Sequence, residues 1–118
     1  MANFLSDNPD LRYYLDEGVD WAALASLSEL GYRQPDGFHD AGEALAFYRE
    51  VANLVGAFAA EEIAPYAAEI DRAGVRLEAG EVVFPPRLAS VFAKLGDLGL
   101  HGLTVPRELG GMNAPIPE

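Results

Sequence analysis

The segment from residue 88 to residue 113, LASVFAKLGDLGLHGLTVPRELGGMN, limits the possible folds of this chain more than any other. Its first half carries apolar residues at helical spacing: Leu88, Val91, Phe92, Leu95 and Leu98. This spacing predicts an amphipathic helix, which leads through glycines into residues 103–105, expected to be extended, and stops at Pro106. The paired Gly110 and Gly111 permit positive φ and close backbone approach. The arrangement is typical of a pocket wall, and it carries no evident catalytic group.

A long amphipathic helix is predicted to begin at Asp40, because Glu43 stands three positions later as in a capping box. Its apolar stripe consists of Ala44, Phe47, Tyr48, Val51, Leu54, Val55 and Phe58. Pro65 removes one backbone donor, so we expect a kink or restart near residues 63–64 and an end near Gly74.

The first third of the chain predicts two short helices. Asn8 and Pro9 are a good helix start, and Asp20 can cap the second helix. The apolar stripes are Leu11, Tyr14 and Leu15 in the first helix, and Trp21, Leu24, Leu27 and Leu30 in the second, with stops at Gly18 and Gly31. Two such small helices cannot bury their apolar faces against each other, so each is expected to pack on another part of the protein.

Alternating apolar residues on both sides of Ala79-Gly80 predict a small β-hairpin over residues 75–84. The predicted fold class is therefore all-α, an antiparallel helical hairpin or bundle with a small β-hairpin insert.

Composition limits the possible partners. With 118 residues the chain has room for one domain. Its net charge of -11 argues against a nucleic-acid groove and against anionic membrane surfaces. An acidic face could meet a basic partner, although a surface that favours solubility is the preferred interpretation of the charge.

The chain has no cysteine, which excludes disulfides, thiolate nucleophiles and cysteine-bound metals. This fits a reducing compartment, and the expected location is the cytoplasm. The N-terminus has no basic region and no long apolar core, so no signal peptide is expected, and no segment is apolar enough to predict a membrane span.

Several residues could suggest chemistry. Gly96, Gly99 and Gly102 lack the spacing of a dinucleotide-binding loop and are interpreted as structural. His39 and His101 show no metal-ligand spacing, and His101 is expected to be a half-buried packing or capping residue.

The adjacent Glu61 and Glu62 point about 100° apart on a helix, so both are expected to be solvated. Trp21 could stack on an adenine or flavin ring, but a lone tryptophan on a helical stripe is more often an anchor to a neighbouring surface. The sequence therefore predicts no catalytic residue and no metal site.

Two stretches resemble one known family. LGDLGLHGLTVPRELGG is similar to the "lgelGLxGLtvPeexGG" segment of flavin-dependent acyl-CoA dehydrogenases, and FAAEEIAPYAAEID is similar to the "fareeiaPxaaexD" helix of their N-terminal domain. The resemblance covers residues 44–112. The insert over residues 75–86 and the extension over residues 1–40 look like the long-form branch that includes 3-methylthiopropionyl-CoA dehydrogenase-like enzymes.

This resemblance implies α,β-dehydrogenation of an acyl-CoA thioester, with FAD bound mainly by domains that follow these residues. It also implies an electron-transfer flavoprotein as acceptor and a homo-oligomer for the full-length enzyme. The chain is expected to be a truncated N-terminal part, inactive alone, that covers one side of the flavin and acyl pocket. Leu109, Gly110, Gly111 and Met112 are the residues expected near that pocket.

The expected organisation is an N-terminal extension over residues 1–40, followed by a partial dehydrogenase N-terminal helical domain over residues 41–118. The alternative is a free-standing, non-catalytic helical interaction module, since the lack of a catalytic constellation fits both interpretations.

Overall fold

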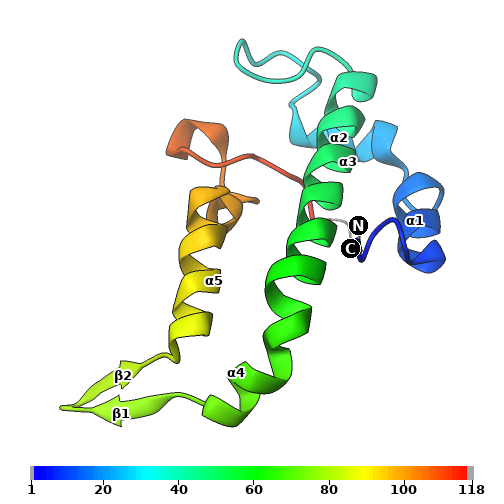
Figure 1. Cartoon of the computed structure of the whole chain (residues 1–118). Coiled ribbons are helices and arrows are strands. Elements are labelled where there is room, and N and C mark those ends of the chain that lie inside the picture. The colour runs from blue at the N-terminus through cyan, green and yellow to red at the C-terminus, as the bar shows by residue number, and fades with distance from the viewer. Residues whose placement is uncertain (1, 117–118) are drawn as a thin grey trace.

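The computed structural model describes residues 2–116 of the chain. The molecule is elongated, 50 × 34 × 23 Å, with a radius of gyration of 17.2 Å. A compact domain of this length would have a radius of about 13 Å. The fold is mostly helical with one small antiparallel sheet, as predicted, and the helices spread over a wide, open arrangement (Figure 1).

Two short helices open the chain, α1 (Pro9–Asp16) and α2 (Trp21–Ser28). The Asn8 side chain accepts hydrogen bonds from the backbone N–H groups of Asp10 and Leu11, and Asp20 accepts one from Ala23. Both predicted caps are confirmed. Helix α1 buries none of its residues, whereas α2 packs on α3.

Helix α3 (Ala41–Phe58) begins at the predicted cap. The Asp40 carboxylate accepts the backbone N–H of Glu43 at 2.9 Å. The Glu43 carboxylate reaches back one residue further than in a standard capping box, to the backbone N–H of His39 at 2.7 Å.

The chain leaves α-helical geometry before Pro65, at Ala59. A π-helical turn (Ala59–Ile63) and a 3₁₀ turn (Ala64–Tyr66) precede α4 (Ala67–Ala73). The wider π turn lets the backbone adjust to the missing proline donor without ending the helical course. The predicted interruption is confirmed, and it starts about one turn earlier than expected.

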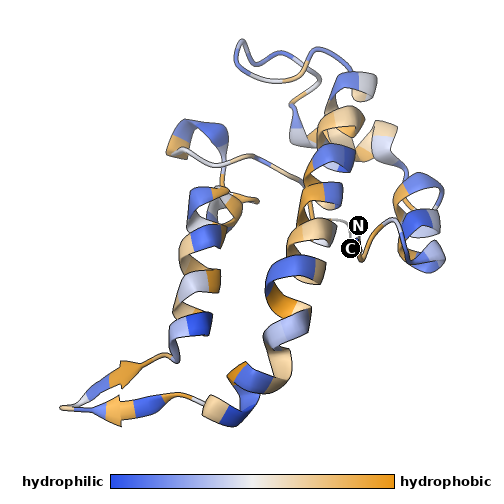
Figure 2. Ribbon diagram, in the orientation of Figure 1, coloured by the Kyte–Doolittle hydropathy of each residue, from blue (hydrophilic) through white to orange (hydrophobic). Residues whose placement is uncertain are grey.

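The β-hairpin is also confirmed. Strands β1 (Arg76–Glu78) and β2 (Glu81–Val83) pair in antiparallel register, with Leu77 opposite Val82. Ala79 and Gly80 both have positive φ, 50° and 83°, as in the two-residue turn that matches strand twist. The hairpin extends from the end of the molecule, and hydrophobic residues occur along both of its strands (Figure 2).

Helix α5 (Pro86–Asp97) runs back beside α3, and Gly99, two residues after its end, has a φ of 72°. Short 3₁₀ turns follow at Leu100–Gly102 and Arg107–Leu109. The expectation of an extended piece at residues 103–105 was wrong, because these residues form turns. The reason is that the Gly102 carbonyl accepts hydrogen bonds from the N–H groups of both Val105 and Met112, which closes the segment into a compact loop.

The core is small and lies between α2, α3 and the linker. Ala25, Ala44 and Tyr48 are buried, and Trp21, Tyr32, Phe38 and Phe47 pack partly buried against them. The predicted α2 stripe was wrong at its C-terminal end, since Leu27 is 75% exposed and Leu30 is 57% exposed. Helix α2 ends at Ser28, and the small Ala25 face is the one that packs against the core. His101 is exposed and lies near the Phe92 ring, so the half-buried role predicted for it was wrong as well.

Candidate functional site: an apolar groove and a clamped loop

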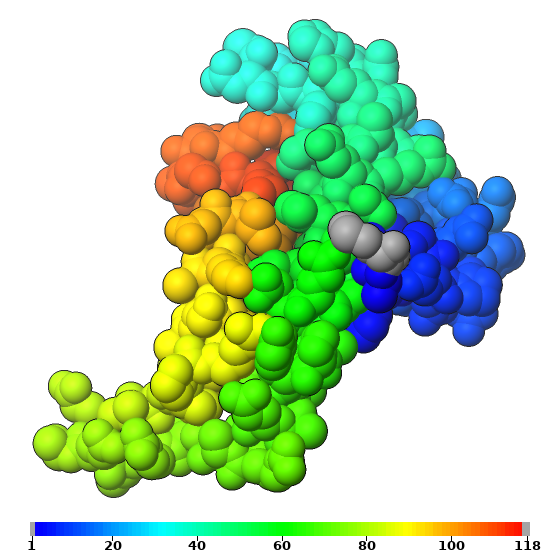
Figure 3. Space-filling view, in the orientation of Figure 1, coloured from blue at the N-terminus to red at the C-terminus, as the bar shows by residue number. Residues whose placement is uncertain are grey.

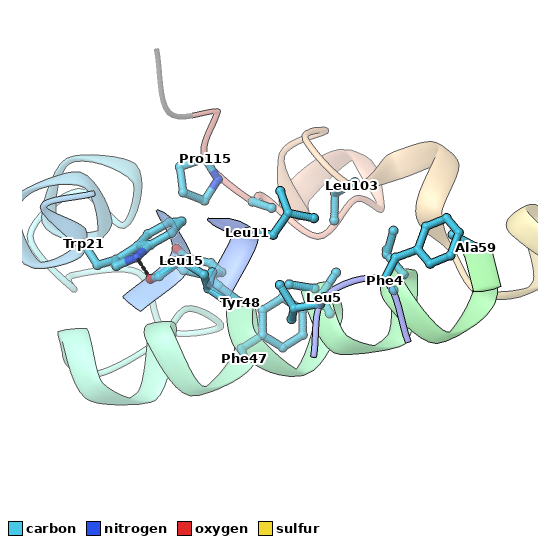
Figure 4. A pocket seen from close by; sticks show the side chains of 15 residues that line it. Phe4, Leu5, Leu11, Leu15, Trp21, Phe47, Tyr48, Ala59, Leu103 and Pro115 are labelled. Carbon is cyan, nitrogen blue, oxygen red and sulfur yellow. Dashed lines mark hydrogen bonds between the residues drawn. The ribbon is translucent and has the colours of Figure 1, made fainter. Parts of the chain in front are cut away.

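The candidate site is an apolar groove of about 480 Å³. It lies between the N-terminal segment, α1, α3 and the C-terminal segment (Figure 4). The residues that line it are Phe4, Leu5, Leu11, Leu15, Trp21, Phe47, Tyr48, Val51, Ala52, Val55, Gly56, Ala59, Leu103, Ala114 and Pro115. No aspartate, glutamate, histidine, lysine or arginine is among these residues, so the groove offers apolar surface and no carboxylate, imidazole or cationic group.

The N-terminal segment forms one wall because α3 has a glycine where the two meet. The Phe4 N–H donates to the Gly56 carbonyl at 3.1 Å, and the Asn3 amide donates to the Asn53 carbonyl at 3.0 Å. A Cβ at Gly56 would overlap the Asn3 side-chain oxygen and approach the Leu5 backbone. This glycine therefore permits the close contact that shapes the groove floor.

Aromatic residues close one end of the groove. The Trp21 indole N–H donates to the Leu15 carbonyl at 2.6 Å, and its ring lies 5.5 Å from the Tyr48 ring (Figure 4). Trp21 thus anchors α1 and α2 to α3, as its anchor interpretation predicted. Burial raises the pKa of the Tyr48 hydroxyl. That hydroxyl is buried without a hydrogen-bond partner among residues 2–116.

The predicted pocket residues lie in the loop that follows α5, outside the groove lining. Leu109 is 74% exposed, and Gly110 has a φ of 89°. Gly111 packs so closely on Val105 that a Cβ would overlap the Val105 carbonyl. Met112 is half-buried, with its side chain beside Gly99. The loop lies between the end of α5 and the first part of α3 (Figure 3).

Both ends of this loop bind the C-terminal end of α2, at Ser28 and its cap residue Glu29. The Arg107 guanidinium donates two hydrogen bonds to the two carboxylate oxygens of Glu29, each at 2.7 Å, and Glu29 is fully buried. The guanidinium also lies over the Phe38 ring, 4.7 Å from its centroid. At the other end of the loop the Asn113 amide donates to the Ser28 carbonyl at 3.2 Å.

In this geometry Arg107 and Glu29 each stabilise the charged form of the other. The hydrogen bond from Arg107 holds the pKa of Glu29 below its usual range, and Glu29 in turn raises the pKa of Arg107. Sequence reasoning missed the pair, because its members are 78 positions apart and no local spacing relates them. The one signal in the sequence was the position of Glu29, which directly follows an apolar helical stretch and stands two positions before Gly31.

A second ion pair joins the bend after α3 to α5. The Lys94 ammonium lies 2.6 Å from the Glu62 carboxylate and lowers its pKa, and the Arg87 guanidinium lies 4.0 Å away. The expectation that both glutamates are solvated was wrong for Glu62, which is 28% exposed, while Glu61 is exposed. The reason is the antiparallel return of α5, which local spacing does not reveal.

Within residues 2–116, no group of three or more histidine or acidic side chains could hold a metal ion. Over the same residues, no helix has the length and hydropathy needed to cross a membrane.

Comparison with known proteins points to one family. Residues 47–118 match the family model of the acyl-CoA dehydrogenase N-terminal domain. The chain is 40% identical over 106 residues to 3-methylmercaptopropionyl-CoA dehydrogenase of Ruegeria pomeroyi, and this match covers 90% of the chain. It is 42% identical over 65 residues to mitochondrial 2-methylacyl-CoA dehydrogenase of Solanum tuberosum, which covers 55% of the chain. No solved structure gives a significant match.

The matches cover only 16% and 14% of the lengths of these two relatives. The chain therefore spans a small part of the proteins that it resembles.

Proposed function

The chain belongs to the acyl-CoA dehydrogenase family, and we propose that it forms part of the N-terminal helical domain of a FAD-dependent enzyme that oxidises the Cα–Cβ bond of an acyl-CoA thioester. In this proposal residues 41–118 belong to the helical domain, with α3 and α5 as an antiparallel pair of its bundle. Residues 1–40 are an extension that packs against it. The observation that carries the proposal is the family match over residues 47–118, which contains the α5 helix and the loop after it.

The role proposed for these residues is to cover one side of the flavin and acyl pocket and keep water away from the reacting carbons. An aromatic-rich groove of about 480 Å³ and a loop that is hydrogen-bonded at both ends suit such a role. Leu109, Gly110, Gly111 and Met112 remain the residues proposed to face that pocket. Acid–base and hydride chemistry would come from other parts of the enzyme, because among residues 2–116 no aspartate, glutamate, histidine, lysine or arginine lines the groove.

FAD would also be bound mainly by other parts of the enzyme. Its pyrophosphate needs cationic or backbone N–H donors, and no lysine or arginine lines the groove. The net charge of -11 further disfavours phosphate binding by this chain. The residues described here therefore do not fit a complete FAD site.

The proposed partners are the acyl-CoA substrate, an electron-transfer flavoprotein and further copies of the full-length enzyme. We also propose a cytoplasmic location, which the lack of cysteine supports. The chain alone would then be colourless and inactive.

The second candidate is a free-standing helical interaction module without chemistry. The observation that favours it is the same absence of carboxylate, imidazole and cationic side chains from the described lining of the groove, together with a well-anchored N-terminal segment.

The experiment is to read the coding frame beyond Glu118 and to express its complete product. A product of the length of the relatives that binds flavin and reduces an acceptor with acyl-CoA supports the enzyme. A stop codon directly after Glu118 with a colourless product would refute it and favour the interaction module. Flavin bound by the 118-residue chain alone would contradict the proposed location of the cofactor.

A further inference from the structure

The loop over residues 106–113 is attached to the N-terminal extension at both of its ends. Arg107, near its start, donates to Glu29, and Asn113, at its end, donates to the Ser28 carbonyl and lies near the same Glu29 carboxylate. The five residues between these anchors include the pair Gly110-Gly111, which has little conformational restriction of its own.

Glu29 is not one of the apolar core residues, yet it is fully buried. Among residues 2–116 it is the largest fully buried side chain, at 0% exposure. A buried carboxylate without a partner is strongly unfavourable, yet here both oxygens are satisfied by the loop itself, and the Asn113 amide lies 3.5 Å from one of them.

The planar guanidinium of Arg107 sets the direction of its contact with Glu29. A guanidinium that donates two parallel hydrogen bonds to a carboxylate sets orientation as well as distance. Arg107 is further held by the Phe38 ring beneath it. Asn113 adopts a φ of 53°, which turns the chain so that its amide meets the Ser28 carbonyl.

We propose that Glu29 is the positioning residue of the loop over residues 106–113: by holding Arg107 and Asn113 together it sets the conformation of Leu109–Met112. The N-terminal extension thereby shapes a segment of the family domain. The link to substrate rests on the proposed function; the link to loop conformation does not.

The test uses the complete product of the coding frame, with Glu29→Gln as the main variant. Gln keeps the shape of the side chain but presents an amide donor to the guanidinium. The matched control is Phe58→Leu, which shortens a buried side chain at the far end of α3. Amide hydrogen exchange is measured across the whole protein, and KM and kcat are measured for acyl-CoA where the product is active.

In E29Q we expect amide exchange over residues 108–113 to accelerate by about tenfold, as for the loss of a charge-assisted hydrogen bond. In F58L the same amides should change no more than the rest of the protein. In an active enzyme E29Q should raise KM with kcat nearly unchanged, because the loop carries no reacting group. Equal KM values for E29Q and F58L would overturn the link to the pocket.

Unchanged loop exchange in folded E29Q would overturn the positioning role. If E29Q does not fold, Asn113→Gly replaces it, because Gly accepts the positive φ and removes only the side-chain contact. Unchanged loop exchange in N113G would then overturn the proposal. An inactive product whose loop exchange still responds to E29Q would refute the dehydrogenase function and leave the positioning role standing.

Discussion

The Arg107 guanidinium donates one hydrogen bond of 2.7 Å to each carboxylate oxygen of Glu29, which stands 78 positions earlier in the sequence. Removing one partner of a buried pair leaves an uncompensated charge. We therefore expect Arg107→Met to lower the free energy of unfolding by about 3–5 kcal/mol. Replacing both residues, as E29M/R107M, should cost much less. Urea unfolding of the two variants measures the difference, and equal losses would contradict it.

The same pair makes the free energy of unfolding depend on pH. Arg107 lowers the folded-state pKa of Glu29 below its ordinary value of 4.5, so the unfolded chain binds a proton first as the pH falls. The contribution of Glu29 is complete above pH 4.5 and is lost as the pH falls through the lowered pKa. E29Q should remove this part of the acid sensitivity, whereas Glu43→Gln, at an exposed carboxylate whose pKa is also lowered, should leave the Glu29 part intact. Unfolding free energies between pH 3 and pH 7 measure both; identical profiles for wild type and E29Q would be inconsistent with a lowered pKa.

The two glycines of the loop should differ in their response to a side chain. Gly110 has open space around it but a φ of 89°, so Gly110→Ala should cost about 1 kcal/mol through backbone strain alone. Gly111→Ala forces the loop away from Val105 and should cost more. Thermal unfolding ranks the two variants, and in an active enzyme flavin retention and turnover should follow the same ranking. A larger loss for Gly110→Ala would show that the contact with Val105 is unimportant.

At Gly56 we do not expect the stability gain that a substitution of Gly by Ala normally gives inside a helix. Ala in place of Gly inside a helix gains about 1 kcal/mol, but at Gly56 the new Cβ would overlap Asn3. We expect Gly56→Ala to release the N-terminal segment and open the groove, which faster proteolysis near residues 3–8 would report. Gly96→Ala is the matched control, because the nearest atom to its new Cβ is 3.8 Å away. Equal protection of the N-terminal segment in both variants would argue against the close contact at Gly56.

The uncovered apolar groove predicts self-association of the 118-residue chain. Val55 lies on the groove wall and is 39% exposed, so a charged side chain can be introduced there. Val55→Lys should weaken association by at least about tenfold, since burying an unpaired charge is costly. Val75→Lys makes the same substitution at an exposed hairpin residue outside the groove. Sedimentation at several concentrations distinguishes them, and equal effects would place the contact elsewhere than in the groove.

Local chemistry alone determined where most elements begin and end. Asn8, Asp20 and Asp40 cap their helices because each carboxylate or amide meets backbone donors two or three residues ahead. The Ala79-Gly80 turn and the break before Pro65 follow from backbone preferences within a few residues. Such features need no information about the rest of the fold, so the sequence was sufficient.

Tertiary structure decided which side chains are buried and which charges meet. Glu29 is buried and Leu27 is exposed, against the ranking of their hydrophobicity, because the loop after α5 brings Arg107 to α2 while nothing covers Leu27 among residues 2–116. Likewise Lys94 reaches Glu62 only because the hairpin turns the chain back. The energies of such contacts depend on distances between segments far apart in sequence, and local periodicity carries no information about those distances.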